Sequence, residues 1–454
     1  MRNVIPKEVI AHELAPLPSN EASPDFILMT ESANIHPVDY KARFYGSTFY
    51  PKHLSTSGLE RTIETTTQSG PHAGIIPPMN PPSFPPPRLI QEESAFRDLV
   101  TTMRSHSRLA VDTESNSLYA YRERVCLIQF SIPGADFLID PLALRDLNPL
   151  DSLFSNPEIE KVFHGAEYDI MCLKRDFGFT FANLFDTQVA SRTLGRKRSG
   201  LKDILAEELG IQMSKRYQRA NWGKRPLSPD LLDYARLDTY YLLPLRDRLA
   251  EALQRAGRWQ EACEACERLT NVDPHDNGFN PDGYWRISNI RTLTPRQVAL
   301  LRELYLYRDS QARRFDRPPF KILGNETLLA IAQESPGDLM ALRDLPGMTH
   351  GKIRRYGDGL LSAVARGRQA PIPRRPTSKR IAEATHVRYE VLHSWRKNVA
   401  RKRRVESDVI LPREVLWEIA QAAPSDTESL RRVMYPLEWR FQAYGEDILT
   451  ILRD

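Results

Sequence analysis

The sequence predicts an α/β domain built on a mixed sheet, followed by two small all-α domains. Segments typical of strands cluster between residues 108 and 164, and helical segments then continue to about residue 257. Residues 308–364 also repeat without a gap as residues 396–452, with 17 identities in 57 aligned positions. A match of that length indicates two copies of one small helical domain.

The α/β domain is assigned to residues 89–257. An amphipathic helix is expected before the first strand, at residues 92–104, and another helix after the last strand, through residues 168–176. Strands that come early and helices that follow favour a mixed sheet over an all-parallel one. The predicted strands, recognised as short apolar runs bounded by turn residues, are residues 109–111, 124–132, 136–139 and 159–164.

The rest of the chain is divided by composition and by the repeat. Residues 1–88 lack any sustained period and hold 14 of the 34 prolines, so we expect a disordered, proline-rich leader there. Cys263 and Cys266 are expected to be ordinary helical residues, because no second pair could complete a zinc site. The other segments are a helical connector, two repeated domains and the basic linker between them, at residues 258–290, 291–370, 386–454 and 371–385.

The composition excludes several classes of protein. Hydrophobic residues make up 41% of the chain and charged residues 27%, which is typical of globular domains and not of a fully disordered chain. No run approaches the roughly 18 apolar residues of a membrane span, and the N-terminal segment lacks the apolar core of a secretory signal. Four cysteines are too few and too scattered for a disulfide scaffold. We therefore expect a cytoplasmic monomer with no membrane partner.

Charge is distributed unevenly along the chain. The total of 63 Lys and Arg against 58 Asp and Glu gives +5, but residues 286–454 hold 31 basic and 20 acidic residues, a net of +11. The remaining 32 basic and 38 acidic residues give −6. The acidic part, residues 1–285, predicts metal binding, and the basic part, residues 286–454, predicts binding to a polyanion. A run of like charges is, however, usually only a solvated surface. The basic side chains concerned are Arg308, Arg313, Arg314, Arg354, Arg355, Arg396, Lys397 and residues 401–404.

Four carboxylates and one tyrosine stand out as candidates for chemistry. Asp112 and Glu114 lie two residues apart on a strand, so both side chains point to the same face and repel unless a cation lies between them. Asp169 begins a helix, and Tyr234 and Asp238 lie one turn apart on another helix. Each has a plain alternative: a chance D-x-E, a first-turn acid that complements the helix dipole, or a solvated helix face. Together they predict a divalent-metal site.

Three segments carry these residues: Val111-Asp-Thr-Glu114, Phe163-His-Gly-Ala-Glu-Tyr-Asp169 and Tyr234-Ala-Arg-Leu-Asp238. They resemble the motifs of the DEDD superfamily of 3′–5′ exonucleases, in the subgroup with tyrosine in the third motif, and most closely the ribonuclease D family. The two repeats resemble HRDC domains. The resemblance covers residues 89–454 and implies a ribonuclease H-like, or DnaQ-like, exonuclease fold followed by two HRDC-like domains.

The resemblance also implies a two-metal mechanism with Mg²⁺ or Mn²⁺. Asp112 would bridge both ions, Glu114 and Asp169 would complete the sites, and Asp238 would hold the ion on the side of the nucleophile. Tyr234 would orient or deprotonate the attacking water. No glycine-rich phosphate motif is present in the sequence, so no nucleotide cofactor is expected.

Contacts with the substrate are expected from a second set of residues: His164, Lys215, Gln218, Trp222 and Arg225. The tryptophan could stack on a base, and the lysine and arginine could contact phosphates. A core position for Trp222 and a structural hydrogen bond for His164 remain as alternatives.

The expected function is a 3′–5′ exoribonuclease that releases nucleoside 5′-monophosphates. Its expected partners are RNA, namely tRNA precursors and other small structured RNAs. A 3′–5′ DNA exonuclease acting in repair on single-stranded DNA is the first alternative, because the carboxylates do not identify the sugar. A non-catalytic nucleic-acid-binding protein is the second.

Overall fold

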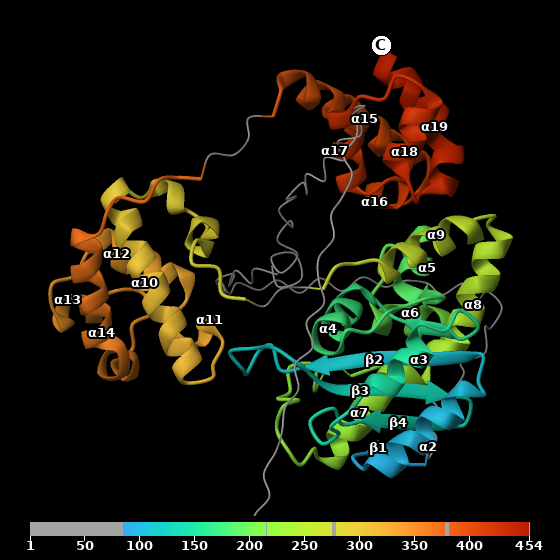
Figure 1. The fold of residues 1–454 in the computed structure, drawn as a ribbon, viewed down its shortest axis with the longest axis horizontal. Coiled ribbons are helices and arrows are strands. Elements are labelled where there is room, and N and C mark those ends of the chain that lie inside the picture. Colours follow the sequence, from blue (N-terminus) through green and yellow to red (C-terminus); the bar gives the residue numbers. More distant parts are fainter. Residues whose placement is uncertain (1–84, 215, 275–277, 377–380, 454) are drawn as a thin grey trace, which may run out of the picture. The chain divides into compact units, whose positions relative to one another are not determined.

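The computed structural model describes residues 85–214, 216–274, 278–376 and 381–453 (Figure 1). The leader predicted for residues 1–88 lies almost wholly outside the described residues, and the first described strand, β1 (Arg88–Ile90), begins at its last residue. Within the described ranges, no helix is both long enough and apolar enough to cross a bilayer.

A six-stranded mixed sheet forms the centre of the first domain. The strand order is β1-β4-β3-β2-β5-β6, with antiparallel pairing of β2 with β3 and of β3 with β4, and parallel pairing elsewhere. This confirms the predicted mixed sheet. The two edge strands were not predicted, because strands of three residues are too short to show a period. The remaining strands are β2 (Arg108–Ser115), β3 (Val125–Ile132), β4 (Ala135–Ile139), β5 (Glu160–Phe163) and β6 (Leu184–Asp186).

Both faces of the sheet are covered by helices (Figure 1). All eight residues of β3 are buried, as expected for a strand with a near-continuous apolar run and helices on both sides. One face packs against α2 and α3, and the other packs against α7 and α8. The helices of the domain are α2 (Glu93–Arg104), α3 (Asp151–Phe154), α4 (Glu167–Phe177), α5 (Thr187–Thr193), α6 (Leu201–Leu209), α7 (Pro229–Tyr240) and α8 (Leu242–Arg255).

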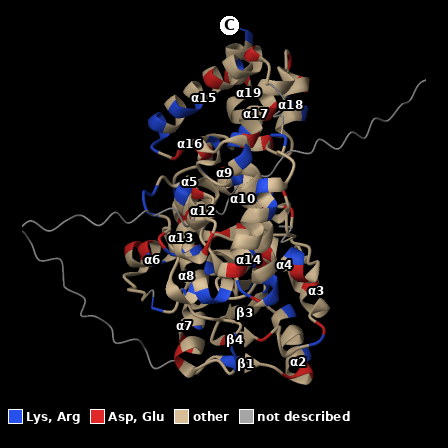
Figure 2. Cartoon of the chain, turned by 90° about the vertical axis from the view of Figure 1, so that its left-hand side faces the viewer, with Lys and Arg blue, Asp and Glu red and all other residues tan. Residues whose placement is uncertain are grey.

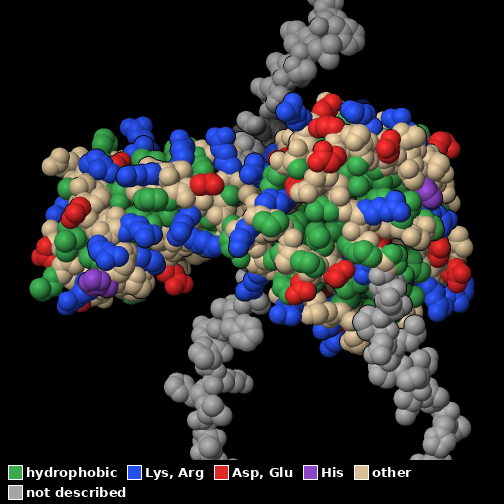
Figure 3. All heavy atoms as spheres, turned by 90° about the horizontal axis from the view of Figure 1, so that it is seen from below, with side chains coloured by type: hydrophobic (Ala, Val, Ile, Leu, Met, Phe, Trp, Pro, Cys, Tyr) green, Lys and Arg blue, Asp and Glu red, His purple; other side chains and the backbone are tan. Residues whose placement is uncertain are grey.

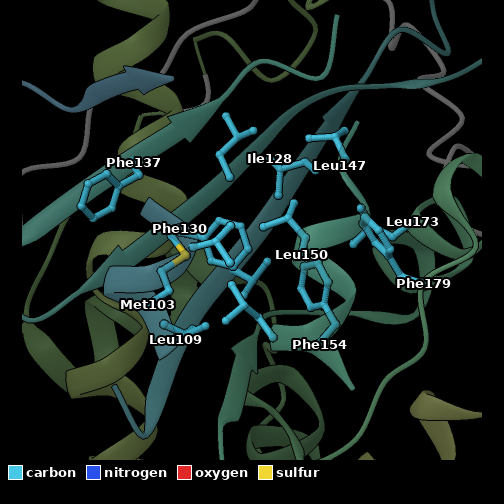
Figure 4. Packing of buried hydrophobic residues seen from close by; sticks show 14 of the residues in the cluster. Met103, Leu109, Ile128, Phe130, Phe137, Leu147, Leu150, Phe154, Leu173 and Phe179 are labelled. Carbon is cyan, nitrogen blue, oxygen red and sulfur yellow. The ribbon is translucent and has the colours of Figure 1, made fainter. Parts of the chain in front are cut away.

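The largest apolar core lies between the sheet and α2, α3 and α4. Phe130 of β3 and Phe154 of α3 meet with ring centroids 5.8 Å apart, and Met103 of α2 is fully buried in the same cluster (Figure 4). Val111 of β2 points into this core. Because successive side chains of a strand point to opposite faces, Asp112 points to the other face of the sheet.

Helix α9 (Trp259–Thr270) lies in the range predicted as a helical connector and packs against β6 of the sheet. Cys266 is 1% exposed in the main core of the sheet, and its sulfur accepts a hydrogen bond from the backbone N–H of Asp186. The predicted connector at residues 258–290 thus begins with a helix that packs on the α/β domain, and the domain boundary itself stays a prediction. Cys263 and Cys266 are both helical, as predicted, and all four cysteines, which lie within the described ranges, are free thiols.

The two repeats fold as the same five-helix unit, with each helix of the second copy beginning 88 residues after its counterpart. The first copy consists of α10 (Pro295–Arg314), α11 (Pro319–Ile322), α12 (Asn325–Glu334), α13 (Leu339–Arg343) and α14 (His350–Gln369). The second consists of α15 (Glu383–Arg403), α16 (Ser407–Ile410), α17 (Arg413–Ala422), α18 (Thr427–Met434) and α19 (Glu438–Arg453). Helix α15 starts inside the range predicted as linker.

Two arginines predicted for the basic surface are core residues of the repeats instead. Arg308 and Arg396 are 7% and 5% exposed, and they donate to the carbonyl oxygens of Leu323 and Leu411, at 3.1 and 2.7 Å. The two arginines are 88 residues apart and so occupy equivalent positions in the two repeats. Both repeats therefore contain the same buried hydrogen bond. Arg403 is likewise used internally, in an ion pair with the buried Glu261.

Candidate active site

Strand β2 presents the first two carboxylates at its carboxyl-terminal half. Alternation along the strand places Ala110, Asp112 and Glu114 on one face and Val111 on the other. Both carboxylates are half-buried, and the register pairs Asp112 with Gln129 and Glu114 with Leu127 of the neighbouring strand. The predicted common face of the D-x-E pair is therefore present.

Helix α4 supplies Asp169 from its first turn. This carboxylate is 8% exposed and accepts a short hydrogen bond from the hydroxyl of Thr113, the residue between the two carboxylates of β2. The turn before α4 is held by Asp186, which accepts hydrogen bonds from the backbone N–H groups of Gly165 and Ala166 at 3.0 and 2.7 Å. Thr113 and Asp186 therefore position the second motif, a role that their own sequence contexts do not reveal.

Helix α7 supplies Tyr234 and Asp238 one turn apart, over the face of the sheet that carries Asp112. The helix is fixed to β3 by the hydroxyl of Thr239, which lies 2.7 Å from that of Ser131. The Tyr234 ring is stacked on Trp222, with centroids 6.3 Å apart and an interplanar angle of 30°.

The electrostatics show that the four carboxylates act on one another. Burial raises the pKa of Asp112 well above its usual range, and the charges of Asp169, Asp238 and Glu114 raise it further. Burial, then repulsion from Asp238 and Asp169, has the same effect on the pKa of Glu114. Burial is also the main reason why the pKa values of Asp169 and Asp238 rise to about 7. Several buried anions in one place are stabilised by a cation.

The donor set fits hard divalent cations. All four side chains offer carboxylate oxygen, the ligand that Mg²⁺ and Mn²⁺ prefer. Among the described residues, however, no three His, Cys, Asp or Glu side chains are close enough to enclose one ion. Mg²⁺ keeps several waters and shares oxygens of the substrate, so its binding does not require a closed cage of protein ligands.

These pKa values predict how the metal-free protein responds to pH. The usual pKa of Asp is 3.8 and the folded values of Asp169 and Asp238 are about 7, so the folded state binds more protons than the unfolded state between these limits. Stability of the metal-free protein should therefore fall as the pH rises from about 4 to about 7. Thermal unfolding in EDTA should show this, and saturating Mg²⁺ should reduce the loss. A Tm that rises from pH 5 to pH 8 in EDTA would contradict the predicted cluster.

The five predicted substrate contacts differ in exposure and in their partners. Gln218 is exposed, as a substrate contact requires, and Lys215 lies outside the described residues. His164 has a structural hydrogen bond, since its Nδ1 lies 2.9 Å from the hydroxyl of Thr187, and burial lowers the pKa of its imidazole. Neutral His164 therefore supports the second motif and does not offer a positive charge to phosphate.

Trp222 and Arg225 were wrong as direct substrate contacts. Trp222 is 1% exposed and packs in the core beneath α7, so its ring cannot serve as a platform for bases. The guanidinium of Arg225 binds both carboxylate oxygens of Asp140 at 2.7 Å, and it donates to the carbonyl oxygens of Trp222 and Cys126 at 2.6 and 2.7 Å. Both residues therefore have structural partners within the domain.

Comparison with known proteins places the two kinds of domain in known families. Residues 87–254 match the 3′-5′ exonuclease family, which is divalent-metal dependent, and residues 297–364 and 386–452 both match the HRDC domain. The chain is 34% identical to the exosome complex exonuclease RRP6 of Saccharomyces cerevisiae over 61% of its own length. It spans only 40% of that protein, and 34% and 30% of related plant and nematode proteins.

One bacterial relative matches over nearly its whole length. The chain is 30% identical to ribonuclease D of Granulibacter bethesdensis, a match that covers 81% of this chain and 93% of that protein. The crystal structure of Escherichia coli RNase D superposes with a TM-score of 0.60 at 25% identity, and covers 81% of this chain and 98% of that one. With its exonuclease and HRDC domains in the same order, the chain belongs to the ribonuclease D family.

Proposed function

We propose that this protein is a metal-dependent 3′–5′ exoribonuclease that releases nucleoside 5′-monophosphates from RNA ends. The observation that carries the proposal is the mutual repulsion of Asp112, Glu114, Asp169 and Asp238 beside one tyrosine. Such a cluster is costly to the fold unless it serves to bind cations. The E. coli relative, an exoribonuclease involved in structured RNA processing, supports RNA as the substrate.

The four carboxylates would hold two divalent ions, Mg²⁺ or Mn²⁺. The ions supply activation of water and stabilise charge on the attacking and leaving oxygens of the phosphodiester. The charges of Asp169, Asp238 and Glu114 all act on Asp112, which would hold a position shared by both ions. Asp238, on α7, would act on the side where Tyr234 also lies.

Tyr234 works as a neutral phenol. Burial raises the pKa of its hydroxyl above the usual value, and the charges of Asp238, Glu114 and Asp112 raise it further. The group therefore remains protonated at neutral pH and cannot act as a tyrosinate base. It would orient the attacking water by hydrogen bonding, and the divalent cations, when bound, would supply the acidity that lets this water lose its proton.

Replacing Tyr234 with Phe should keep the stacked ring and remove only the hydroxyl. We expect kcat to fall by about 10²-fold, with little change in KM, because positioning of the nucleophile is lost while RNA binding is not. The measurement is steady-state release of nucleotides from an oligoribonucleotide, with Tm as the control for folding. A Tyr234→Phe variant with normal kcat would exclude a role for the hydroxyl.

The first HRDC-like domain supplies the basic surface that would hold RNA. Arg354 and Arg355 on α14 and Arg313 and Arg314 on α10 are exposed, and Lys and Arg side chains gather over this domain, the left-hand body in Figure 3. The second copy carries Gln442 and Ala443 where the first has the α14 pair, although it keeps a basic run at the end of α15 (Figure 2). Phosphate contact is therefore expected mainly from the first copy.

Neutralising this pair should weaken RNA binding without changing the chemistry. For Arg354→Gln/Arg355→Gln we expect a higher KM, an unchanged kcat and a salt dependence of affinity that is lower by about 1.4, since each phosphate contact contributes about 0.7 on a single strand. The matched control is Arg97→Gln/Arg145→Gln, which removes two exposed charges from the exonuclease domain. Equal effects of the two double variants would contradict a specific RNA surface on α14.

The choice between RNA and DNA is tested with matched oligonucleotides of the same sequence. We expect the RNA strand to be shortened faster, and we expect a precursor tRNA with a 3′ trailer to be trimmed one nucleotide at a time. Equal or faster degradation of DNA would favour the alternative, a DNA exonuclease.

A further inference from the structure

Gln129, in the middle of β3, has a buried amide that the fold leaves without a partner. Its side chain is 0% exposed, and neither Oε1 nor Nε2 has a hydrogen-bond partner among the described residues. Two residues along the same strand, Ser131 is also buried but is bonded to Asp136 and Thr239. A buried amide without partners destabilises a protein, whereas an apolar side chain of similar size would not. Such an exception requires an explanation.

The position of Gln129 indicates what its amide serves. In the antiparallel register it stands directly opposite Asp112, so the two side chains leave the same face of the sheet with their Cβ atoms about 5 Å apart. That face is covered by α7, which is bonded to Ser131 through Thr239, the residue after Asp238. Gln129 therefore lies under α7 and beside the central carboxylate, in the part of the core nearest to the metal ligands.

We infer that Gln129 is a positioning residue for Asp112. Its amide, through one buried water, holds the Asp112 carboxylate in the orientation that binds a divalent cation. The inference rests on the metal site of the proposed function. Groups that orient a metal ligand typically change metal affinity by 10–100-fold when they are removed. A neutral amide can do this without adding a fifth negative charge to four carboxylates that already repel one another.

The test uses Gln129→Leu in the full-length protein and reads metal binding directly. Mn²⁺ is titrated into the metal-free protein and the free ion is followed by electron paramagnetic resonance. We expect Mn²⁺ affinity to fall at least 10-fold, kcat to fall by a similar factor at fixed Mn²⁺, and KM for RNA to change little. The Tm of the metal-free variant should be equal to or above that of the wild type, because an unpartnered polar group has been removed.

The matched control is Ser191→Ala in α5. The hydroxyl of Ser191 is also fully buried and without a partner among the described residues, but it belongs to another element and is not a neighbour of the carboxylates in sequence or register. This variant should keep the Mn²⁺ affinity of the wild type. If Gln129→Leu lowers the Tm, Gln129→Met fills the same space with a more adaptable side chain and must show the same loss of affinity.

Wild-type Mn²⁺ affinity in a folded Gln129→Leu or Gln129→Met variant overturns the inference, whatever the nuclease assay shows. A wild-type protein that binds Mn²⁺ but releases no nucleotide would instead overturn the proposed function. In that case the change in Mn²⁺ affinity still decides the role of Gln129.

Discussion

Replacing Asp112 with Asn is expected to reduce nucleotide release by at least about 10³-fold, the upper end of the cost of losing one electrostatic contact at a reacting centre. Asn keeps the shape of the side chain but loses the charge that a bridging ligand needs. Burial and the charges of Asp169, Asp238 and Glu114 all raise the pKa of Asp112, so the substitution removes a charge that the other carboxylates repel.

The same substitution should make the metal-free protein more stable. Removing one of four mutually repelling charges relieves the fold, and each kcal/mol of relief raises Tm by roughly 2–4 °C for a domain of this size. Lower activity together with a higher Tm in EDTA at pH 8 is a signature that a damaged core would not give. RNA affinity of Asp112→Asn in the absence of divalent ions serves as the binding control. Unchanged hydrolysis by this variant would refute the assignment of Asp112 to the metal site.

Replacing Arg225 with Met is expected to cost about 3–5 kcal/mol of stability, the usual result of leaving a buried charge unpaired. Burial by itself raises the pKa of Asp140, which is 1% exposed, but hydrogen bonds from Arg225 and Gln91 outweigh burial and hold that pKa below its usual value. Without the guanidinium, the Asp140 carboxylate loses its charged partner but keeps the donors of Gln91 and Leu142. The carbonyl oxygens of Trp222 and Cys126 each lose a hydrogen bond.

Two controls separate this structural role from the substrate role that the motif suggested. Lys224→Met removes an exposed charge from the neighbouring position and should leave Tm unchanged. Adding Asp140→Leu to Arg225→Met should recover part of the lost stability, because the unpaired carboxylate is then gone. Denaturant unfolding measures these values. A normal unfolding free energy for Arg225→Met combined with a tenfold higher KM for RNA would support phosphate contact instead.

Patterns among residues close in sequence were sufficient to predict most of the fold. The apolar run of β3 and the one-turn spacing of Tyr234 and Asp238 depend on residues close in sequence, so a period can reveal them. The ungapped match at 88 residues predicted that the two repeats are copies of one small helical domain. Strands β1 and β6 were missed because three residues carry no period. The packing of α9 against β6 could not be predicted, because it is a contact between distant segments.

In the candidate site, too, features that depend on residues close in sequence were predictable, and contacts between distant segments were not. The four carboxylates and Tyr234 were identified because their chemistry requires those residue types at those spacings. Trp222 and Arg225 were predicted to contact RNA because the type of a residue does not reveal whether its side chain is exposed or buried. The partner of Arg225 is Asp140, 85 residues away in the chain, and only the folded structure brings the two together. Arg308 and Arg396 were misassigned to the basic surface for the same reason.

The metal-dependent exonuclease site is tested most directly by one gel. An RNA labelled at its 5′ end is incubated with the full-length protein in Mg²⁺, in EDTA, and in EDTA followed by excess Mg²⁺. The carboxylate site predicts a ladder that shortens one nucleotide at a time from the 3′ end in Mg²⁺, intact RNA in EDTA, and restored shortening when Mg²⁺ is returned. Shortening that continues in EDTA, or internal fragments that appear before the ladder, would contradict it.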